Sequence, residues 1–247
     1  MTILDRRKLG TDPTSGWMYY DLHFASSYVH GEALLVGNYR SCIERAEGVQ
    51  AVGLGVWARK MKAQGYHELY THAFISMWSA FETGMENMVA TYLRNDVKVA
   101  QTALTQLSNK QQAKHPLASW PWTREVCLGI SAILESKAKA ATVDGGIDLF
   151  GRLKTMLGWL DVHVKDNPDI ATDLAEANRV RNIILHRYGE VAESDVAAIK
   201  SLSPWTQQVM PMNADKFWQY QRAISETIIA IMSAVGTSRH NAPEKRS

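Results

Sequence analysis

One stretch of the chain carries side chains whose types and spacing could do chemistry. It reads EANRVRNIILHRYGEV and spans residues 176–191. Arg179, Arg181, Asn182 and His186 fall within about two turns of a predicted helix, beside a run of three aliphatic residues. Burying that face of the helix would be costly unless each polar group found a partner. The pattern therefore raises the question of a binding or catalytic role.

The positions of these side chains around a helix decide which of them can meet. At about 100° per residue, Asn182 and His186 share one face, and Arg179 lies within about 20° of His186. Arg181 lies about 140° from His186. It therefore reaches the same place only through its long side chain, or from a second subunit.

Together these groups are the minimum set for cleaving RNA without a metal ion. His186 can take the proton from a ribose 2′-OH or give one to the leaving 5′-oxygen. Asn182 can hydrogen-bond one imidazole nitrogen and fix the tautomer. A neighbouring guanidinium can hold phosphate and stabilise its pentacoordinate form. From geometry alone, a solvated basic helix face explains the same pattern at least as well.

Other motifs for metal or cofactor chemistry fail on spacing or context. The histidines of HELYTH (residues 67–72) are five apart, so they lie about 140° apart on a helix and cannot form the H-E-x-x-H zinc site. The stretch GLGVWA (residues 53–58) matches a dinucleotide fingerprint, but no strand is predicted before it. We therefore expect neither a metal ion nor another cofactor.

The bulk properties of the chain exclude several classes of protein. Its 247 residues carry a formal net charge of +2, which does not support binding nucleic acid through bulk charge but allows a local basic patch. Cys42 and Cys127 are far apart and are expected to be reduced thiols. No signal-peptide core and no apolar run of roughly 20 residues is present. We expect a cytoplasmic protein that does not engage a membrane.

The elements that must position residues 176–191 are predicted to be helices. Apolar residues recur at helical spacing over nearly the whole chain, and alternating β-branched runs are scarce. Segments with glycine or proline separate the periodic ones. Helices are predicted at residues 17–30, 32–47, 66–94, 96–113, 123–141, 146–160, 169–188 and 213–235.

Two of these helices carry the strongest apolar stripes, with residues repeating at spacings of three and four. The stripes consist of Phe74, Met77, Trp78, Phe81, Met85, Met88 and Tyr92, and of Phe217, Tyr220, Ile224, Ile228, Ile231 and Val235. They predict an all-α helical bundle. A change to glycine-richer sequence before residue 65 suggests three parts: an N-terminal helical extension (1–65), a helical domain (66–236) and a flexible tail (237–247).

The same stretch resembles the signature of HEPN-domain proteins, which is an arginine and a polar residue followed by histidine, R-x4-H. Here the signature runs from Arg181 through Asn182 to His186, and Tyr188 extends it to R-x4-H-x-Y. Its context is similar too, because the motif lies on a late helix and a long apolar helix closes the domain. The resemblance covers roughly residues 66–236 and implies a helical bundle of HEPN type.

The resemblance also implies roles for individual residues. The catalytic residues that it implies are Arg181, Asn182, His186, Tyr188 and Glu82. Glu82 belongs to the stretch WSAFETGMEN and is expected to face the motif, with Glu86 one turn further on as its substitute. We expect Arg179 and Arg187 to bind substrate.

A homodimer is the assembly that the resemblance implies, with the motifs of both subunits in a cleft at the two-fold axis. The implied function is a metal-independent endoribonuclease of a toxin–antitoxin, abortive-infection or other antiviral defence system. RNA is then the substrate, its products carry a 2′,3′-cyclic phosphate, and an antitoxin or defence protein is a candidate partner. Some members have lost catalysis, so a non-catalytic dimeric binding or scaffold module is the alternative.

Overall fold

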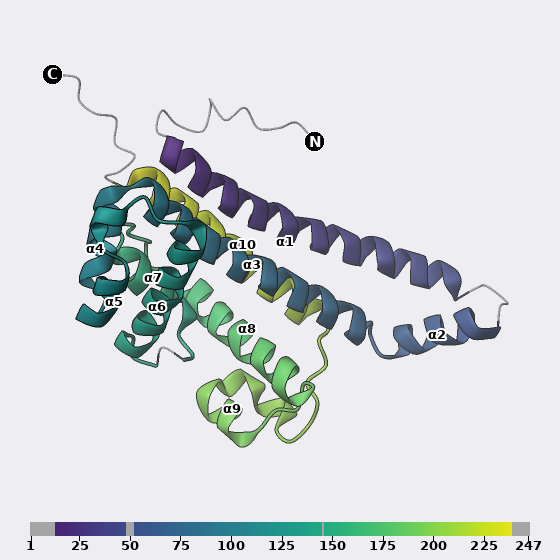
Figure 1. The fold of residues 1–247 in the computed structure, drawn as a ribbon. Coiled ribbons are helices and arrows are strands. Elements are labelled where there is room, and N and C mark those ends of the chain that lie inside the picture. The colour runs from purple at the N-terminus through teal and green to yellow at the C-terminus, as the bar shows by residue number, and fades with distance from the viewer. Residues whose placement is uncertain (1–12, 48–51, 145, 239–247) are drawn as a thin grey trace.

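Three long helices run side by side and form the centre of the molecule (Figure 1). They are α1 (Pro13–Ala46), α3 (His67–Asn95) and α10 (Ala214–Thr237). No β-strand occurs in the part of the chain that the structure describes. The predicted all-α class is therefore confirmed.

The computed structural model describes residues 13–47, 52–144 and 146–238. Positions 1–12 of the predicted extension and nearly all of the predicted tail lie outside the described residues. The shorter helices are α2 (Val52–Ala63), α4 (Val97–Thr105), α5 (Asn109–Lys114), α6 (Arg124–Ala141), α7 (Leu149–Gly158), α8 (Pro168–Arg187) and α9 (Glu193–Ala198), with 3-10 turns η2 (Leu117–Ser119) and η3 (Lys200–Trp205). Among the described helices, none combines the length and apolar character that crossing a bilayer requires.

The core between α3 and α10 is rich in aromatic side chains. Every residue of the two predicted apolar stripes is buried. The rings of Phe74 and Tyr220 have their centroids 5.2 Å apart, and those of Tyr70 and Phe217 are also 5.2 Å apart. Such tilted contacts stabilise a core beyond the area that the rings bury.

α1 belongs to the same core because it crosses α3 at close range. Gly84 of α3 lies at this crossing, and an added Cβ there would lie 2.5 Å from the Cβ of Ala25. Leu22 and Val29 of α1 are fully buried against the bundle. The described part of the segment that sequence composition set apart, residues 1–65, therefore contributes to the main hydrophobic core.

Some helix boundaries differ from the predicted ones. The two helices predicted at 17–30 and 32–47 are the single helix α1, since one internal glycine costs only about 1 kcal/mol and the buried face continues on both sides of Gly31. The helix predicted at 96–113 is divided into α4 and α5, because Ser108 starts a new helix with a capping box. The short helix α9 falls in a segment predicted to be a loop.

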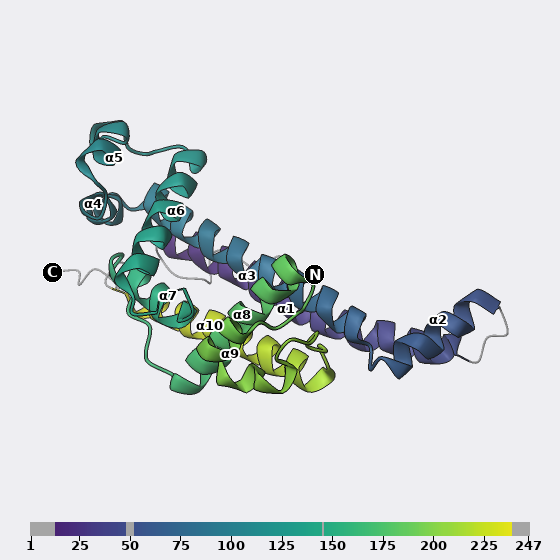
Figure 2. The same ribbon diagram turned by 90° about the horizontal axis from the view of Figure 1, so that it is seen from below.

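The remaining elements cover opposite ends of the long helices. Figure 2, a view from below, shows α4, α5 and α6 at one end and α2 at the other, where it folds back along α1. α8 lies beside α10 and leads to α9. The stretch singled out by sequence analysis thus runs along the edge of the bundle.

A histidine joins the start of α3 to the segment that leads into α10. Nδ1 of His67 accepts a 2.6 Å hydrogen bond from the backbone N–H of Met212. Burial lowers the pKa of this imidazole below its ordinary value of 6.5, and the charge of Glu68 opposes that shift. A protonated Nδ1 could no longer accept the bond.

We expect this contact to make stability depend on pH. The folded-state pKa of His67 is lowered, so the unfolded chain takes up the proton first, and the stability present above the ordinary pKa of 6.5 is lost as the pH falls below it. Melting temperatures measured by circular dichroism should fall from about pH 7.5 to about pH 5.5. His67→Gln keeps an acceptor that does not titrate, so it should flatten the profile. An unchanged profile in this variant would assign the dependence to other groups.

Candidate functional site

The helix that carries the motif is well defined at both ends. α8 begins at Pro168, and the side chain of Asn167 caps it by accepting a 3.2 Å hydrogen bond from the N–H of Ile170. It ends where Tyr188 and Gly189 adopt left-handed conformations, with φ of 52° and 91°. Its buried apolar residues recur at helical spacing and are Ile170, Leu174, Ala177, Val180 and Ile183.

Arg181 is held by two partners on the partly exposed side of α8. Its guanidinium donates a 2.9 Å hydrogen bond to Oε2 of Glu82 on α3, and a 3.0 Å bond to Oδ1 of Asn182. The predicted contact between Glu82 and the motif is therefore present. For Glu86, burial and then the charges of Glu135 and Glu82 raise the pKa of the carboxyl.

His186 and Tyr188 lie at the exposed end of the helix. The side chain of His186 makes no hydrogen bond to any residue that the structure describes, including Asn182. The expected bond between Asn182 and the imidazole is thus absent, and the amide oxygen of Asn182 accepts from Arg181 instead. Tyr188 is 93 % exposed, so its hydroxyl is free to meet a ligand. The backbone of Tyr188 is also left-handed, a conformation that is costly for a residue other than glycine.

The other two arginines of the stretch are engaged by a buried carboxylate, Asp195 of α9. Arg179 forms an ion pair with it at 2.5 Å, although the pair lacks hydrogen-bond geometry, and Arg187 donates a hydrogen bond to its other oxygen. The same oxygen of Asp195 accepts a 2.8 Å hydrogen bond from the N–H of Ala192. Arg179 and Arg187, which we expected to bind substrate, therefore fix the segment that follows the motif.

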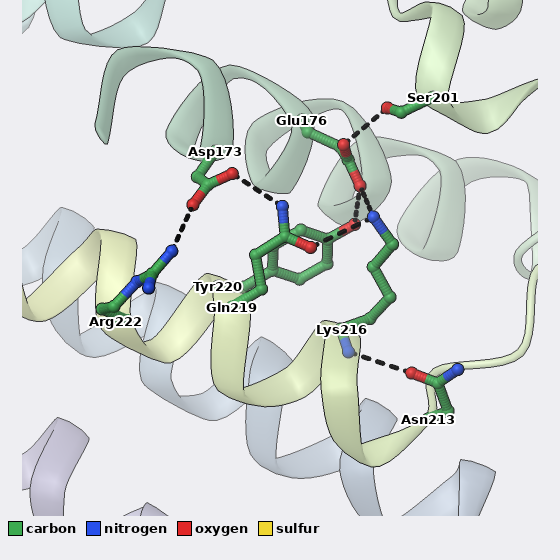
Figure 3. A network of polar contacts seen from close by, with 8 residues as sticks. All are labelled: Asp173, Glu176, Ser201, Asn213, Lys216, Gln219, Tyr220 and Arg222. Atoms are coloured by element: carbon green, nitrogen blue, oxygen red, sulfur yellow. Dashed lines mark hydrogen bonds and ion pairs between the residues drawn. The ribbon is translucent and has the colours of Figure 1, made fainter. Parts of the chain in front are cut away.

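The first half of α8 is fixed to α10 by a second buried carboxylate, Glu176 (Figure 3). It accepts hydrogen bonds from Lys216, from the hydroxyl of Tyr220 at 2.7 Å and from the hydroxyl of Ser201 at 2.5 Å. Burial alone would raise the pKa of Glu176, but these three donors bring it below its ordinary value. Burial and the charge of Glu176 raise the pKa of Tyr220, so this hydroxyl remains a donor.

A second acidic residue of α8 extends this contact towards the surface (Figure 3). Oδ1 of Asp173 accepts a 2.6 Å hydrogen bond from Gln219, and Oδ2 forms a 3.2 Å ion pair with Arg222. Gln219 in turn accepts a bond of 3.1 Å from Lys216. Two acidic residues one turn apart thus fix the register of α8 on α10.

An open apolar groove borders the motif. It has a volume of about 820 Å³, with the exposed face of α3 as its floor, α1 as one wall and the end of α8 as the other. Phe24 and Tyr28 line the α1 wall, and Ile184 and Leu185 line the α8 wall. The floor between them is formed by small residues, Ser76, Ser79, Ala80 and Thr83. Leu185 directly precedes His186, so whatever fills the groove comes close to the motif.

The roles of Asp195 and Glu176 are not evident from the motif and its spacing. Each is a buried acid whose partners lie far along the chain or across a turn, so spacing on one helix could not reveal them. One feature of the sequence could have indicated buried acidic partners, because several arginines on a partly buried helix require carboxylates nearby. Within the described residues, no group of three or more potential metal ligands is clustered.

No protein-family model, no curated protein and no solved structure matches this chain. What the structure establishes is the class of protein, an all-helical bundle with a polar cluster between α3 and the late helix α8.

We expect the buried pair of Glu176 and Lys216 to show strong coupling in stability. Lys216→Met leaves a buried carboxylate without its cation, so it should lower the free energy of unfolding by about 3–5 kcal/mol. Combining it with Glu176→Gln removes the unpaired charge and should recover most of that loss. Urea denaturation of the single and double variants measures the coupling. A double variant as unstable as Lys216→Met would show that charge burial is not the cause.

Proposed function

We propose that this protein is a metal-independent endoribonuclease with a HEPN-type fold. The observation that carries the proposal is the difference between the partners of the polar side chains along α8. Arg179 and Arg187 pair with Asp195, which is fully buried, whereas Arg181 pairs with Glu82, whose side chain is 41 % exposed. His186 follows on the same helix and makes no hydrogen bond to any described residue. A cluster of this kind supplies an orienting acid, a phosphate-binding cation and a group that moves protons.

The reaction proposed for these residues needs no redox partner. The ribose 2′-oxygen attacks the adjacent phosphorus, the bond from phosphorus to the 5′-oxygen breaks, and the products carry a 2′,3′-cyclic phosphate and a 5′-OH. His186 removes the 2′-OH proton or protonates the leaving oxygen. Arg181 stabilises the charge on the pentacoordinate phosphate. Tyr188 extends into solvent beside them and can donate to phosphate or stack on a base.

A second copy of the chain is part of the proposal. Arg181 and His186 lie about 140° apart on α8, so one active centre is most easily completed by groups from two subunits. The apolar groove beside the motif supports this, because it offers apolar surface that a second copy could cover close to His186. Asn182 and Glu82 would then hold Arg181 in place until phosphate displaces one of them.

The biological setting proposed is a cytoplasmic defence system, with an antitoxin or other defence protein as a candidate partner. The alternative function is a non-catalytic dimeric binding or scaffold module. The engagement of Arg181 by a carboxylate favours that alternative, since the ion pair partly neutralises the cation. A cleavage assay separates the two.

We expect cleavage of total RNA in EDTA that depends on His186. Removing a general acid–base typically costs about 10²–10⁴-fold in rate, so His186→Ala should lose nearly all activity. His163→Ala, at another exposed histidine, is the matched control and should cleave like the native protein. Gel analysis should show products with 5′-OH ends. Cleavage that EDTA abolishes, or that persists in His186→Ala, would rule out this mechanism.

Arg181 and Arg179 should differ in what they affect. Arg181→Ala should cripple cleavage while leaving the fold intact, because Glu82 is exposed enough to be hydrated without its partner. Arg179→Ala should chiefly lower the melting temperature, because it leaves the buried carboxylate of Asp195 with fewer cations. Cleavage rates and melting temperatures of both variants test this. Loss of activity in a fully stable Arg179→Ala, with Arg181→Ala active, would reverse the assignment.

A further inference from the structure

α1 carries two apolar stripes, one buried in the bundle and one largely exposed, and in the exposed one the hydroxyl of Tyr28 is hydrogen-bonded to Ser76 of α3 at 3.2 Å. The buried stripe includes Leu22, Val29 and Val36. The other consists of Phe24, Tyr28, Leu35 and Tyr39, whose exposed fractions lie between 40 % and 59 %. At about 100° per residue these four side chains fall within about 60° of one another, roughly 120° round from the buried stripe. We refer to these four residues as the outer stripe.

The spacing of the outer stripe is symmetric about the point between Gly31 and Glu32. Reading outwards from that point, Tyr28 and Leu35 are equally distant, and so are Phe24 and Tyr39. An antiparallel pair of identical helices with its two-fold axis at this point would place Phe24 against Tyr39 of the other helix and Tyr28 against Leu35. A stripe selected to bind an unrelated surface has no need of this symmetry.

Gly31 lies at the midpoint of the stripe along the helix and about 50° round from its centre line, at the edge of the proposed contact. It has no Cβ, and one added there would meet nothing within 4 Å in the monomer. A glycine inside a long helix costs stability unless close approach of another backbone makes use of it. Gly84, at the crossing of α1 with α3, already plays that part within the subunit.

We infer that the outer stripe of α1 binds the outer stripe of a second copy of this chain, antiparallel, with the two-fold axis between Gly31 and Glu32. This deepens the proposed function by naming the surface that forms the dimer, and its test does not require ribonuclease activity. Phe24 and Tyr28 also line the groove beside α8. The second copy's α1 would therefore lie along that groove and close to Leu185.

The outer stripe offers apolar surface that a second copy would cover. The exposed parts of the four side chains amount to about 400 Å² per subunit, taking roughly 200 Å² for each whole side chain. Phe24 and Tyr28 of the groove are already included in this sum, so the groove adds Ile184 and Leu185 to a total of roughly 800 Å² for two subunits. That total places the contact at the small end of protein interfaces. Glu32 is nearest the axis, and its carboxylate turns away to accept a 3.3 Å hydrogen bond from Ser76.

Cysteine cross-linking tests the register. Gly31→Cys, in a Cys42→Ser background that leaves only buried Cys127, places two thiols beside the proposed axis. Mild oxidation should convert most of this variant to a disulfide-linked dimer. Gly37→Cys is the matched control, because Gly37 is also a glycine of α1 with open space around it but lies about 170° from the centre of the stripe. It should remain largely uncross-linked.

Introducing a charged residue into the outer stripe tests whether the stripe stabilises the dimer. Light scattering at micromolar concentration should give about twice the 27.7 kDa chain mass for the native protein and the single-chain mass for Leu35→Arg. Ile229→Arg, at an exposed aliphatic residue of α10, should remain a dimer. A dimer that survives Leu35→Arg and fails to cross-link through Gly31→Cys would overturn the inference while leaving a dimer on another face. A native monomer would overturn it together with the two-subunit site, and would assign the outer stripe to a different protein.

Discussion

The arrangement around α8 depends on one physical constraint, the cost of leaving a charge buried and unpaired. Removing an ion from water costs several kcal/mol even after the protein relaxes, and only well-placed partners offset that cost. α8 carries Arg179, Arg181 and Arg187 along the edge of an apolar core, and Glu176 within it. Each of these four charges has a partner of opposite sign on another element. The partners lie on α3, α9 and α10, so the position of α8 is set by charge neutralisation as well as by packing.

The same cost distinguishes the arginines that neutralise a buried acid from the arginine that a ligand can bind. Asp195 is fully buried and shares two cations, so withdrawing either arginine would leave its charge poorly compensated. Glu82 is more exposed and holds a single cation, so water or phosphate can replace it at lower cost. A ligand that competes for arginine would therefore recruit Arg181 before its neighbours. Spacing on an isolated helix suggests the opposite order, because Arg179 is the arginine that shares a face with His186.

Much of the fold could be predicted from the sequence because its main signals are local. The stripes of α3 and α10 repeat at helical spacing, and every member is buried. Helix breaks were less predictable, since a glycine such as Gly31 ends a helix only when tertiary contacts do not continue through it. For the site, the contact between Arg181 and Glu82 could be expected from a family resemblance but not from spacing, because 99 residues separate the pair. The role of Asp195 could not be predicted, since it requires knowing that α9 folds back under α8.

Large apolar side chains that are exposed on the outside of the molecule are unfavourable in a comparable way. α1 is a long helix whose inner face is fully used, yet its outer face exposes large side chains where polar ones would be favoured. These side chains continue into the groove that ends at Leu185, one residue before His186. A ribonuclease that cleaved RNA indiscriminately as a monomer would gain nothing from that continuity. An enzyme whose catalytic groups come together only on association would gain control of its activity, because that activity would then depend on the concentration of assembled chains. If the proposed function holds, the position of the groove beside the motif places the assembly surface and the catalytic residues next to each other.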